Sequence, residues 1–360
     1  MDMLELQRDA MKVKPASKRA ARQKSSVTPP DVYRLCYNES PYGPSPKVVE
    51  ALTQGAQKAF IYPDWFGIDM KMAAAELNGV DKNCIIPGTG SSAMICMLGE
   101  IFLNPGDEMI VGDPSYEAFR DVAYDYGATP VTVPLDDDMC YDLDAMLAAI
   151  TPKTKMIVVV NPNNPTGTFI ESAKLEEFIK KVPENIITVV DEAYLEYVTK
   201  PETYSMTKLI AEGYGKPLII LKTLSKIYGM AGIRVGYGVM APDTADCMCK
   251  SSHAWNVSKI GQDAAVVALK EQGYIQTISD VNSLERDRVM NALKKMGCRV
   301  YESQTNFILF KSEKKSAAEI RDFLAENKVL IGAPVECCRV SLGTLEMNDK
   351  FIALMKEILA

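Results

Sequence analysis

Short apolar runs rich in β-branched residues alternate with amphipathic stretches over the first two thirds of the chain. The runs predict strands at Asn83–Pro87, Glu108–Val111, Thr129–Val133, Met156–Val160, Ile186–Val190 and Pro217–Leu221. The amphipathic stretches predict helices at Ser91–Phe102, Glu171–Lys181 and Tyr204–Glu212. Two of the runs, at 156–160 and 186–190, are almost continuously apolar, which is typical of strands covered on both faces. The pattern therefore predicts an α/β fold with a mainly parallel sheet between layers of helices.

A change of pattern near residue 245 predicts a second, smaller domain. The helices and strands expected after it are Gln262–Lys295, Arg299–Tyr301, Phe307–Phe310, Ala317–Asn327, Cys338–Leu342 and Asn348–Leu359. At roughly 150 residues per domain, 360 residues are also enough for two packed regions. We expect an N-terminal arm over residues 1–30, a large domain over 31–245 whose first segment can pack on the small domain, and a small α+β domain over 246–360.

Composition and charge exclude several classes of protein. The net charge of −7 argues against a nucleic-acid-binding protein, and no apolar run reaches the roughly 18 residues of a membrane span. The single histidine, His253, excludes a metal site built from several histidines. Nine cysteines without a CxxC pair, and no evident export signal, predict a reducing cytoplasm. Basic residues gather between Arg8 and Lys24 with acidic residues nearby, so we expect a solvated arm or one that lies on a partner subunit.

Lys226 follows the apolar run Pro217–Leu221 and has the most specific chemical setting in the chain. Hydroxyl groups flank it at Thr223 and Ser225, and a second cation, Arg234, follows shortly afterwards. A nearby cation and partial burial favour the neutral amine that a Schiff base with an aldehyde cofactor requires. The hydroxyls and the arginine would hold a phosphate dianion. Taken alone, Lys226 could equally be a solvated loop residue, the commoner role of a lysine after a strand.

Further motifs also follow predicted strands, at the carboxyl ends where open α/β sheets bind ligands. These motifs are Pro87–Ser92, Asp113–Tyr116, Asn161–Gly167 and Val189–Tyr194. Gly90, Ser91 and Ser92 open a helix and would offer donors to an anion, although a turn with a helix cap explains the same residues. The ring of Tyr116 could stack on a heteroaromatic ring or simply pack against a turn.

Two charged residues and a rigid turn complete the candidate site. Asp191 ends an otherwise apolar strand and needs a partner to stay charged. A protonated pyridine nitrogen would be such a partner, whereas a helix N-cap is the alternative role. Two prolines and a glycine fix the turn Asn161–Gly167, so that its asparagine amides are aimed rather than mobile. Arg339 could clamp a substrate carboxylate or form an ordinary surface ion pair.

The chain from Tyr37–Pro46 to Arg339–Thr344 resembles pyridoxal 5′-phosphate (PLP) enzymes of the aspartate aminotransferase fold type. Within that group it is most similar to the histidinol-phosphate aminotransferase family. The resemblance implies PLP as cofactor and transfer of an amino group between an L-amino acid or related amine and a 2-oxo acid. It also implies a role in amino-acid biosynthesis and a homodimer with shared active sites.

The resemblance assigns a role to each candidate residue. Lys226 would carry the cofactor and act as general base and acid, with Asp191 on the pyridine nitrogen. Tyr194 and Asn164 would hydrogen-bond the phenolic oxygen. The full set implied for cofactor binding is Gly90, Ser91, Ser92, Tyr116, Asn164, Asp191, Tyr194, Thr223, Ser225, Lys226, Arg234 and, reaching the neighbouring subunit's cofactor phosphate, Tyr62. The residues implied for substrate binding are Arg339 and Asn306.

The chain departs from the family in ways that concern the substrate. The early leucine-x-proline-tyrosine segment has no counterpart in residues 1–30, and an arginine expected before Arg339 is missing from Val329–Ala333. Ala254–Asn256 replaces a proline-tyrosine-asparagine stretch. We therefore expect histidinol phosphate to be no better a substrate than some carboxylate-bearing amino acid, such as an aromatic one. A PLP-dependent decarboxylase or lyase on the same fold is the alternative, and a non-catalytic binding protein is a second.

Overall fold

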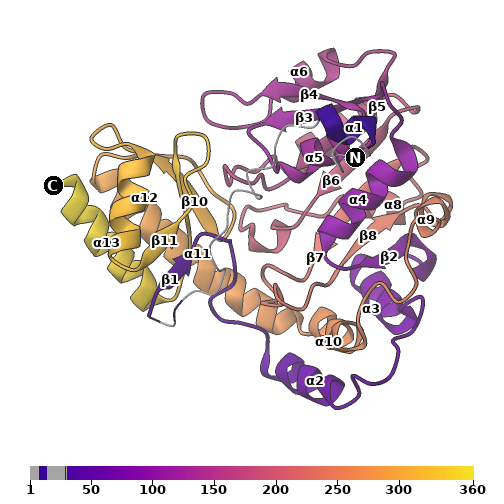
Figure 1. Cartoon of the computed structure of the whole chain (residues 1–360), viewed down its shortest axis with the longest axis horizontal. Helices are drawn as coiled ribbons and strands as arrows, with labels where there is room; N and C mark the ends of the chain where they lie inside the picture. The colour runs from indigo at the N-terminus through magenta and orange to yellow at the C-terminus, as the bar shows by residue number, and fades with distance from the viewer. Residues whose placement is uncertain (1–7, 14–28, 30) are drawn as a thin grey trace, which may run out of the picture.

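The computed structural model describes residues 8–13, 29 and 31–360 and has a large region around a seven-stranded sheet and a smaller C-terminal region (Figure 1). The strands of the large sheet are β2 (Ile85–Gly88), β3 (Glu108–Asp113), β4 (Thr129–Pro134), β5 (Thr154–Val160), β6 (Ile187–Asp191), β7 (Leu218–Thr223) and β8 (Gly236–Met240). Their order is β2-β8-β7-β6-β5-β3-β4. Strand β8 runs opposite to the other six strands of this sheet, so the predicted mainly parallel sheet is confirmed.

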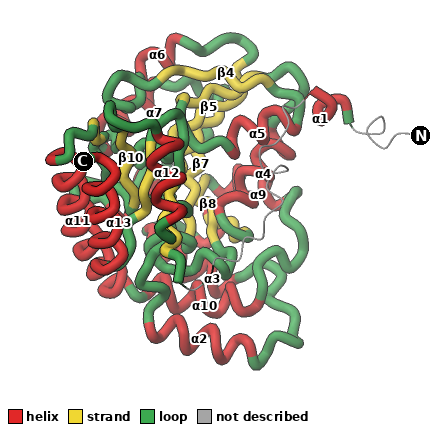
Figure 2. The backbone as a smooth tube through the Cα atoms, turned by 60° about the vertical axis from the view of Figure 1, so that its left-hand side comes forward, coloured by secondary structure: helices red, strands yellow, loops and turns green. Residues whose placement is uncertain are grey.

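Helices cover both faces of this sheet (Figures 1 and 2). Those of the large region are α2 (Pro46–Ala56), α3 (Ile68–Asn78), α4 (Ser91–Phe102), α5 (Ala118–Asp125), α6 (Leu143–Ala148), α7 (Ser172–Lys181), α8 (Thr207–Ala211), α9 (Pro242–Cys249) and α10 (Lys259–Lys270), with short 3₁₀ turns η2 (Lys82–Cys84) and η3 (Leu195–Tyr197). Alternate residues of β5 enter two cores. Ile157 and Val159 pack in a core with α6 and α7, whereas Met156 and Val158 pack in a core with α4 and α5. This double burial explains why the strand is apolar throughout.

The smaller region contains an antiparallel sheet and a parallel strand pair. Its elements are β1 (Tyr33–Leu35), α11 (Gln272–Lys295), β9 (Arg299–Val300), β10 (Phe307–Lys311), α12 (Ala317–Glu326), β11 (Val329–Ile331), β12 (Cys338–Ser341) and α13 (Leu345–Leu359). Strands β9, β10 and β12 form the sheet, and β1 pairs in parallel with β11. The three helices pack with these strands in one apolar core. The first strand of the chain therefore lies in the C-terminal region (Figure 1).

The long helix expected over 262–295 is two helices, α10 and α11, with a break after Lys270. α10 contacts α2 and α3, and its Ala264 lies in the same core as the central sheet. α11 belongs to both regions, because Ile278 lies in that core whereas Val289 lies in the core of the smaller region. We therefore propose that the boundary between the domains lies within α11 rather than after residue 245.

The described part of the N-terminal arm lies against the large region of its own chain. Its helix α1 (Asp9–Val13) contacts α5. Arg8 donates a hydrogen bond to the carbonyl of Asp125 at 2.7 Å, and its guanidinium carbon lies 5.4 Å from the centroid of the Tyr126 ring. The remainder of the expected arm, residues 1–7, 14–28 and 30, lies outside the described residues.

Two further findings apply to the described ranges. None of their helices combines the length and the apolar character that crossing a membrane requires. Nor do three or more histidine, cysteine, aspartate or glutamate side chains of those ranges gather as metal ligands would.

Candidate active site

Lys226 lies in the turn after β7, at the carboxyl edge of the central sheet. Its side chain is half-buried, and its amine donates a hydrogen bond to the carbonyl of Tyr37 at 3.3 Å. The centroid of the Tyr194 ring lies 5.5 Å from the same amine. The segments after β1 and after β6 therefore meet at Lys226, between the two regions of the chain.

Asp191 ends β6 and is buried at the same edge of the sheet. Its Oδ1 accepts a hydrogen bond from the backbone N–H of Ala193 at 3.0 Å. Burial raises the pKa of the carboxyl group to about 7, although the Ala193 N–H and the positive charges of Lys226 and Lys222 act in the opposite direction. A cation bound against this carboxyl group would favour its charged form. The site thus offers a buried acceptor suited to a pyridinium nitrogen.

Tyr194 is held by a residue that sequence reasoning did not single out. Its hydroxyl oxygen accepts a hydrogen bond from Nδ2 of Asn38 at 3.0 Å, and its ring lies edge-on to Phe307 with the centroids 5.1 Å apart. Asn38 is buried with a positive φ of 57°. The backbone N–H of Asn38 also donates to Oγ of Ser341 at 2.8 Å. Asn38 therefore joins Tyr194 to β12 of the smaller region.

The turn before α4 and the turn after β7 together form a cradle of hydrogen-bond donors. Gly90 has a φ of +80° and precedes α4, whose first residues are Ser91 and Ser92 and whose N-terminus has no side-chain cap. Arg234 donates to Oγ of Ser225 at 3.3 Å, and a Cβ placed on Gly90 would lie 2.7 Å from Nη2 of this arginine. Uncapped N–H groups, hydroxyls and a guanidinium are the donors that a phosphate requires.

Thr223 lies beside this cradle. Its Oγ1 accepts a hydrogen bond from the backbone N–H of Ser225 at 3.1 Å. Both residues are buried, so the turn that carries Lys226 is held by its own hydroxyl groups. The structure thus brings Thr223, Ser225 and Lys226 together with Arg234, as the sequence predicted.

The three asparagines of the turn after β5 have different surroundings. Asn161 bonds the backbone of Ile170 through both ends of its amide, at 2.9 and 2.8 Å. Asn163 is fully buried and bonds the carbonyl of Pro114 and the hydroxyl of Ser115. These two asparagines brace the turn. Asn164 is the one that reaches the small-region side of the site.

Asn164 meets Arg339 of β12. Nη1 of Arg339 donates to Oδ1 of Asn164 at 2.6 Å, and Nη2 donates to the carbonyl of Cys36 at 2.9 Å. Nε of the same guanidinium is buried and has no hydrogen-bond partner among the described residues. Burial lowers the pKa of Arg339. A half-buried guanidinium with donors to spare is suited to an anionic ligand.

Asn306 precedes β10 and lies beneath the segment that carries Asn38. Its Nδ2 donates to the carbonyls of Asn38 and Glu39 at 3.1 and 3.3 Å. Its Oδ1 is buried and makes no hydrogen bond within the described ranges. Asn306 therefore supports the wall of the site from the small-region side and keeps one acceptor for a ligand.

Two further candidate residues pack against other aromatic rings of the large region. Tyr116 packs against the α4–α5 core and lies edge-on to Phe119, with the ring centroids 6.3 Å apart. Tyr62 is 74% exposed and stacks on Trp255 at a centroid distance of 4.6 Å. The roles expected for Tyr116 and Tyr62 stay predictions.

A buried ion pair lies next to the site on β6 and β7. Nζ of Lys222 is 2.7 Å from Oε2 of Glu192, and both side chains are almost fully buried. Burial disfavours the charge of Lys222, but Glu192 and Glu196 outweigh it and raise the pKa of Lys222. Glu192 thus has a partner of its own and leaves Asp191 as the carboxyl group of the site. The residues before Lys222 in the sequence are apolar, so the sequence did not predict its ion pair with Glu192.

The residues present fit PLP on three separate counts. Asp191 suits the ring nitrogen, the Gly90–Arg234 cradle suits the phosphate, and the amine of Lys226 suits the aldehyde. Fold and site together define a PLP-dependent enzyme of fold type I.

The comparisons with known proteins place the chain within this class. The family model for aminotransferase class I and II matches residues 30–354, and the chain belongs to this family. A histidinol-phosphate aminotransferase from Moorella thermoacetica is 37% identical over 334 residues, which are 92% of this chain and 86% of that protein. One from Brevibacillus brevis is 34% identical over 91% of this chain and 90% of the relative.

A solved structure extends the likeness to the cofactor. The crystal structure of histidinol-phosphate aminotransferase from Sinorhizobium meliloti in complex with pyridoxal-5′-phosphate has a TM-score of 0.87 at 28% identity, covering 98% of this chain and 96% of that one. The protein is thus a PLP-dependent aminotransferase that acts on amino-acid and 2-oxo acid substrates, as expected. The decarboxylase or lyase alternative is not favoured by these relatives.

Proposed function

We propose that the amino donor is histidinol phosphate and the acceptor a 2-oxo acid, with carboxylate-bearing amino acids as competing donors. The half-buried guanidinium of Arg339, bonded to Asn164, carries this proposal because it is a cation with free donors on the small-region side of the site. The relatives named above act, by their names, on histidinol phosphate. The second arginine of the family is missing from Val329–Ala333, so we expect histidinol phosphate to be no better a donor than some carboxylate-bearing amino acid.

The experiment that tests this proposal compares kcat/KM for histidinol phosphate with kcat/KM for a panel of L-amino acids, with 2-oxoglutarate as acceptor. We expect turnover of histidinol phosphate and a preference below about a thousandfold over the best amino acid, because one charge-assisted contact is missing. No turnover of histidinol phosphate would refute the proposed donor. A larger preference would refute the single-arginine account of specificity.

Within this function we propose the following division of roles. PLP, when bound, withdraws electrons from the substrate Cα and so makes its proton removable. With PLP in the site, Lys226 would act as the base and acid that moves this proton, and Asp191 would keep the ring nitrogen protonated. Nδ2 of Asn164 and the hydroxyl of Tyr194 orient the phenolic oxygen. The residues proposed to hold the phosphate are Gly90, Ser91, Ser92, Thr223, Ser225 and Arg234, and the remaining contacts are Tyr116 on the ring and Arg339 and Asn306 on the substrate.

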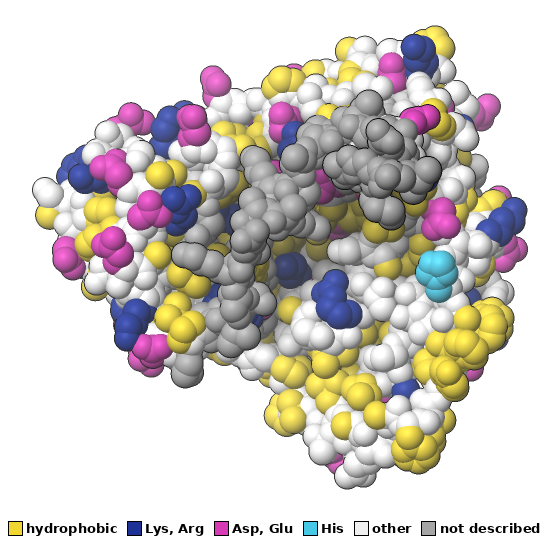
Figure 3. All heavy atoms as spheres, in the orientation of Figure 1, with side chains coloured by type: hydrophobic (Ala, Val, Ile, Leu, Met, Phe, Trp, Pro, Cys, Tyr) yellow, Lys and Arg dark blue, Asp and Glu magenta, His cyan; other side chains and the backbone are white. Residues whose placement is uncertain are grey.

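We also propose that two copies of the chain form a dimer with shared active sites. The connection between α2 and α3 exposes large hydrophobic side chains: Phe60, Tyr62 and Trp65 are 85, 74 and 53% exposed. Figure 3 shows hydrophobic side chains gathered at the lower right, where this connection lies in Figure 1. An exposed cluster of aromatic rings favours a protein interface. In such a dimer Tyr62 would reach the cofactor phosphate of the neighbouring subunit.

The location proposed for the enzyme is the cytoplasm. No disulfide joins any of the nine cysteines in the described part of the chain. A chain with many thiols and no disulfide suits a reducing compartment. Cell fractionation would test this.

A further inference from the structure

A buried arginine on α11 lies where the two regions of the chain meet. Arg286 is 2% exposed and sits between the part of α11 that packs on the large region and the part that packs on the smaller one. Nε of this guanidinium makes no hydrogen bond within the described ranges but lies 3.7 Å from Oδ1 of Asp287, and burial lowers the pKa of Arg286. Burying a guanidinium is costly unless its donors are satisfied, so the contacts of Nη1 and Nη2 decide what this arginine does.

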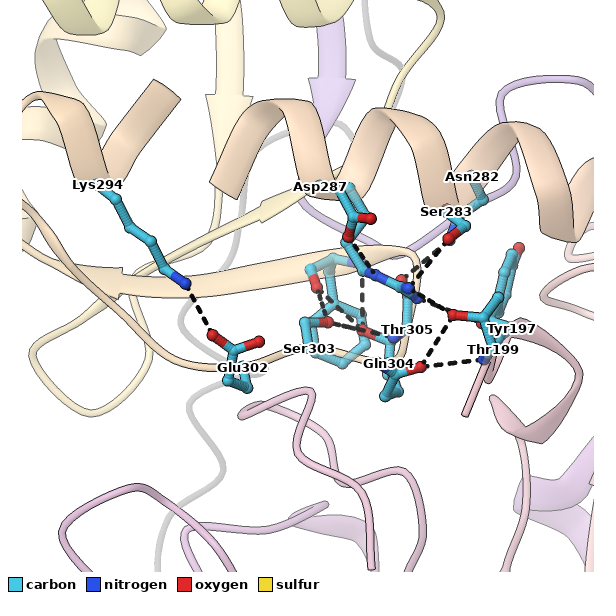
Figure 4. A network of polar contacts seen from close by, with 12 residues as sticks. Tyr197, Thr199, Asn282, Ser283, Asp287, Lys294, Glu302, Ser303, Gln304 and Thr305 are labelled. Carbon is cyan, nitrogen blue, oxygen red and sulfur yellow. Dashed lines mark hydrogen bonds and ion pairs between the residues drawn. The ribbon is translucent and has the colours of Figure 1, made fainter. Parts of the chain in front are cut away.

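The first partner of Arg286 is the segment after η3, which belongs to the large region. Nη1 donates to the carbonyl of Tyr197 at 3.3 Å, and Nη2 donates to Oγ1 of Thr199 at 2.9 Å (Figure 4). Tyr197 is fully buried in the core of the large region. This segment directly continues the one that carries Asp191 and Tyr194.

The second partner is the turn before β10, reached through Thr199 and through α11 itself. The amide oxygen of Gln304 accepts from the backbone N–H of Thr199 at 3.0 Å. Asn282, one helical turn before Arg286, donates to the carbonyl of Thr305 at 3.1 Å (Figure 4). This turn leads directly into Asn306. One face of α11 therefore holds both segments.

The same turn also touches the asparagine loop of the large region. The backbone N–H of Gln304 donates to the carbonyl of Gly167 at 2.8 Å. A Cβ on Gly167 would lie 2.6 Å from Oγ of Ser303, so the two backbones are in close contact. Gly167 ends the turn that carries Asn164. The segments of Tyr194, Asn164 and Asn306 thus converge on the network around Arg286.

From these contacts we infer that Arg286 is a positioning residue, which fixes the smaller region against the large one and so sets the placement of Arg339 and Asn306 over the cofactor site. The inference rests on the proposed roles of these two residues. A planar guanidinium suits this task, because its donors bind the carbonyl of Tyr197 and the hydroxyls of Thr199 and Ser283 at fixed angles, as a lysine ammonium does not. Positioning matters for rate, since an error of about 1 Å in a site can cost about a hundredfold.

The test uses the holoenzyme and conservative variants. Arg286→Lys keeps the charge and removes the fork, and Thr199→Val removes its hydroxyl partner. We expect each variant to lower kcat/KM for the amino donor about tenfold or more, chiefly through KM, with the absorbance of the bound cofactor unchanged. The double variant should lose no more than Arg286→Lys alone, because both changes break one contact.

Arg288→Lys is the matched control. Arg288 lies on the same helix and bonds Glu285 of that helix and Asp349 of α13. This variant should keep the wild-type kcat/KM. Equal losses in Arg286→Lys and Arg288→Lys, or losses that multiply in the double variant, would reduce Arg286 to an ordinary stabilising residue and overturn the inference.

A second measurement is independent of catalysis. Energy transfer between labels at Asp144 of α6 and Glu357 of α13, both exposed, reports the placement of the two regions. We expect a broader distance distribution in Arg286→Lys than in the wild type and in Arg288→Lys. An unchanged distribution would overturn the inference even if transamination of histidinol phosphate fails, so the two proposals fail separately.

Discussion

Arg339 of the smaller region donates a 2.6 Å hydrogen bond to Oδ1 of Asn164 in the large region. Because the oxygen of the amide is taken by the arginine, the Nδ2 end is left to serve as a donor towards a ligand. One contact therefore orients a residue expected on the cofactor and a residue expected on the substrate. A ligand bound to Asn164 can therefore affect the position of Arg339, and a ligand bound to Arg339 can affect that of Asn164.

Replacing Lys226 by alanine should give folded protein that cannot hold the cofactor covalently. The reason is that Lys226 is the amine placed at the carboxyl edge between Tyr37 and Tyr194. Borohydride reduction of the wild type followed by peptide mapping should label Lys226. The exposed Lys47, paired with Glu271, provides a control variant. Reductive label on another lysine would contradict the assignment.

Replacing Asp191 by asparagine should leave the cofactor bound but slow proton abstraction by several orders of magnitude. The buried carboxyl group is the proposed counter-charge of the ring nitrogen, and each tenfold loss corresponds to roughly 1.4 kcal/mol. Stopped-flow measurement of the half-reaction with the amino donor tests this. Asp322→Asn on α12, where the exposed carboxylate pairs with Arg321, is the control. A near-normal rate in Asp191→Asn would make Asp191 a structural cap.

The stability of the cofactor-free protein should fall as the pH rises from about 4 to about 7. Burial raises the pKa of Asp191 from 3.8 to about 7, so the folded state binds this proton more tightly than the unfolded state. The stabilisation is complete below the unfolded pKa and is lost as the pH passes the folded one, on the order of 4 kcal/mol in all.

Urea unfolding of the cofactor-free protein across this pH range measures that loss. The Asp191→Asn variant is the reference, because its amide does not titrate. The difference between the two proteins should therefore shrink towards low pH. A difference that is constant with pH would show that Asp191 is already ionised in the cofactor-free site.

Replacing Arg339 by lysine should lower kcat/KM about ten- to a hundredfold, because it removes at least one charge-assisted hydrogen bond to an anionic substrate. It also removes the bond to Asn164. The loss should appear with histidinol phosphate and with amino acids alike. Arg321→Lys on α12, an exposed arginine beside Asp322, is the control and should be neutral. An equal effect of both substitutions would argue against a substrate role for Arg339.

Mixing two inactive variants should restore activity if Tyr62 serves the neighbouring subunit. A heterodimer of Lys226→Ala and Tyr62→Ala has one site with both residues intact, so about one quarter of the wild-type activity is expected after random exchange. Activity of the mixture against each variant alone is the measurement. Phe60→Ala is the matched control for loss of an exposed aromatic ring. No recovery despite exchange of subunits would place Tyr62 outside the shared site.

Much of the fold and of the site follows from local pattern. The apolar runs predict the parallel strands to within a few residues, and the helix expected over Ser91–Phe102 has those bounds in the structure. The chemical groups follow the strands directly in the sequence. Their common location is a property of parallel sheets and needs no tertiary contact to predict.

Strand β8 shows why other parts of the fold could not be predicted from the sequence. It reads Gly236-Tyr237-Gly238-Val239-Met240, and glycine weakens a strand pattern. The glycine at 236 is needed because a Cβ there would lie 2.7 Å from the backbone nitrogen of Ser91. The need arises from a helix far away in the sequence. The role of Asn38 could not be predicted for the same reason, because its partner Tyr194 is also distant in the sequence.

The alternation of β5 between two cores has a consequence for how such an enzyme can change. A shift of β5 by one residue would move each of its side chains from one core into the other. The register of the strand is therefore fixed. Val158 and Val159 can be replaced by other aliphatic residues without a change of this register. The asparagine turn that follows then stays at the same height on the sheet. The buried residues of the strand can therefore vary in sequence, while the site residues that follow the strand keep their position.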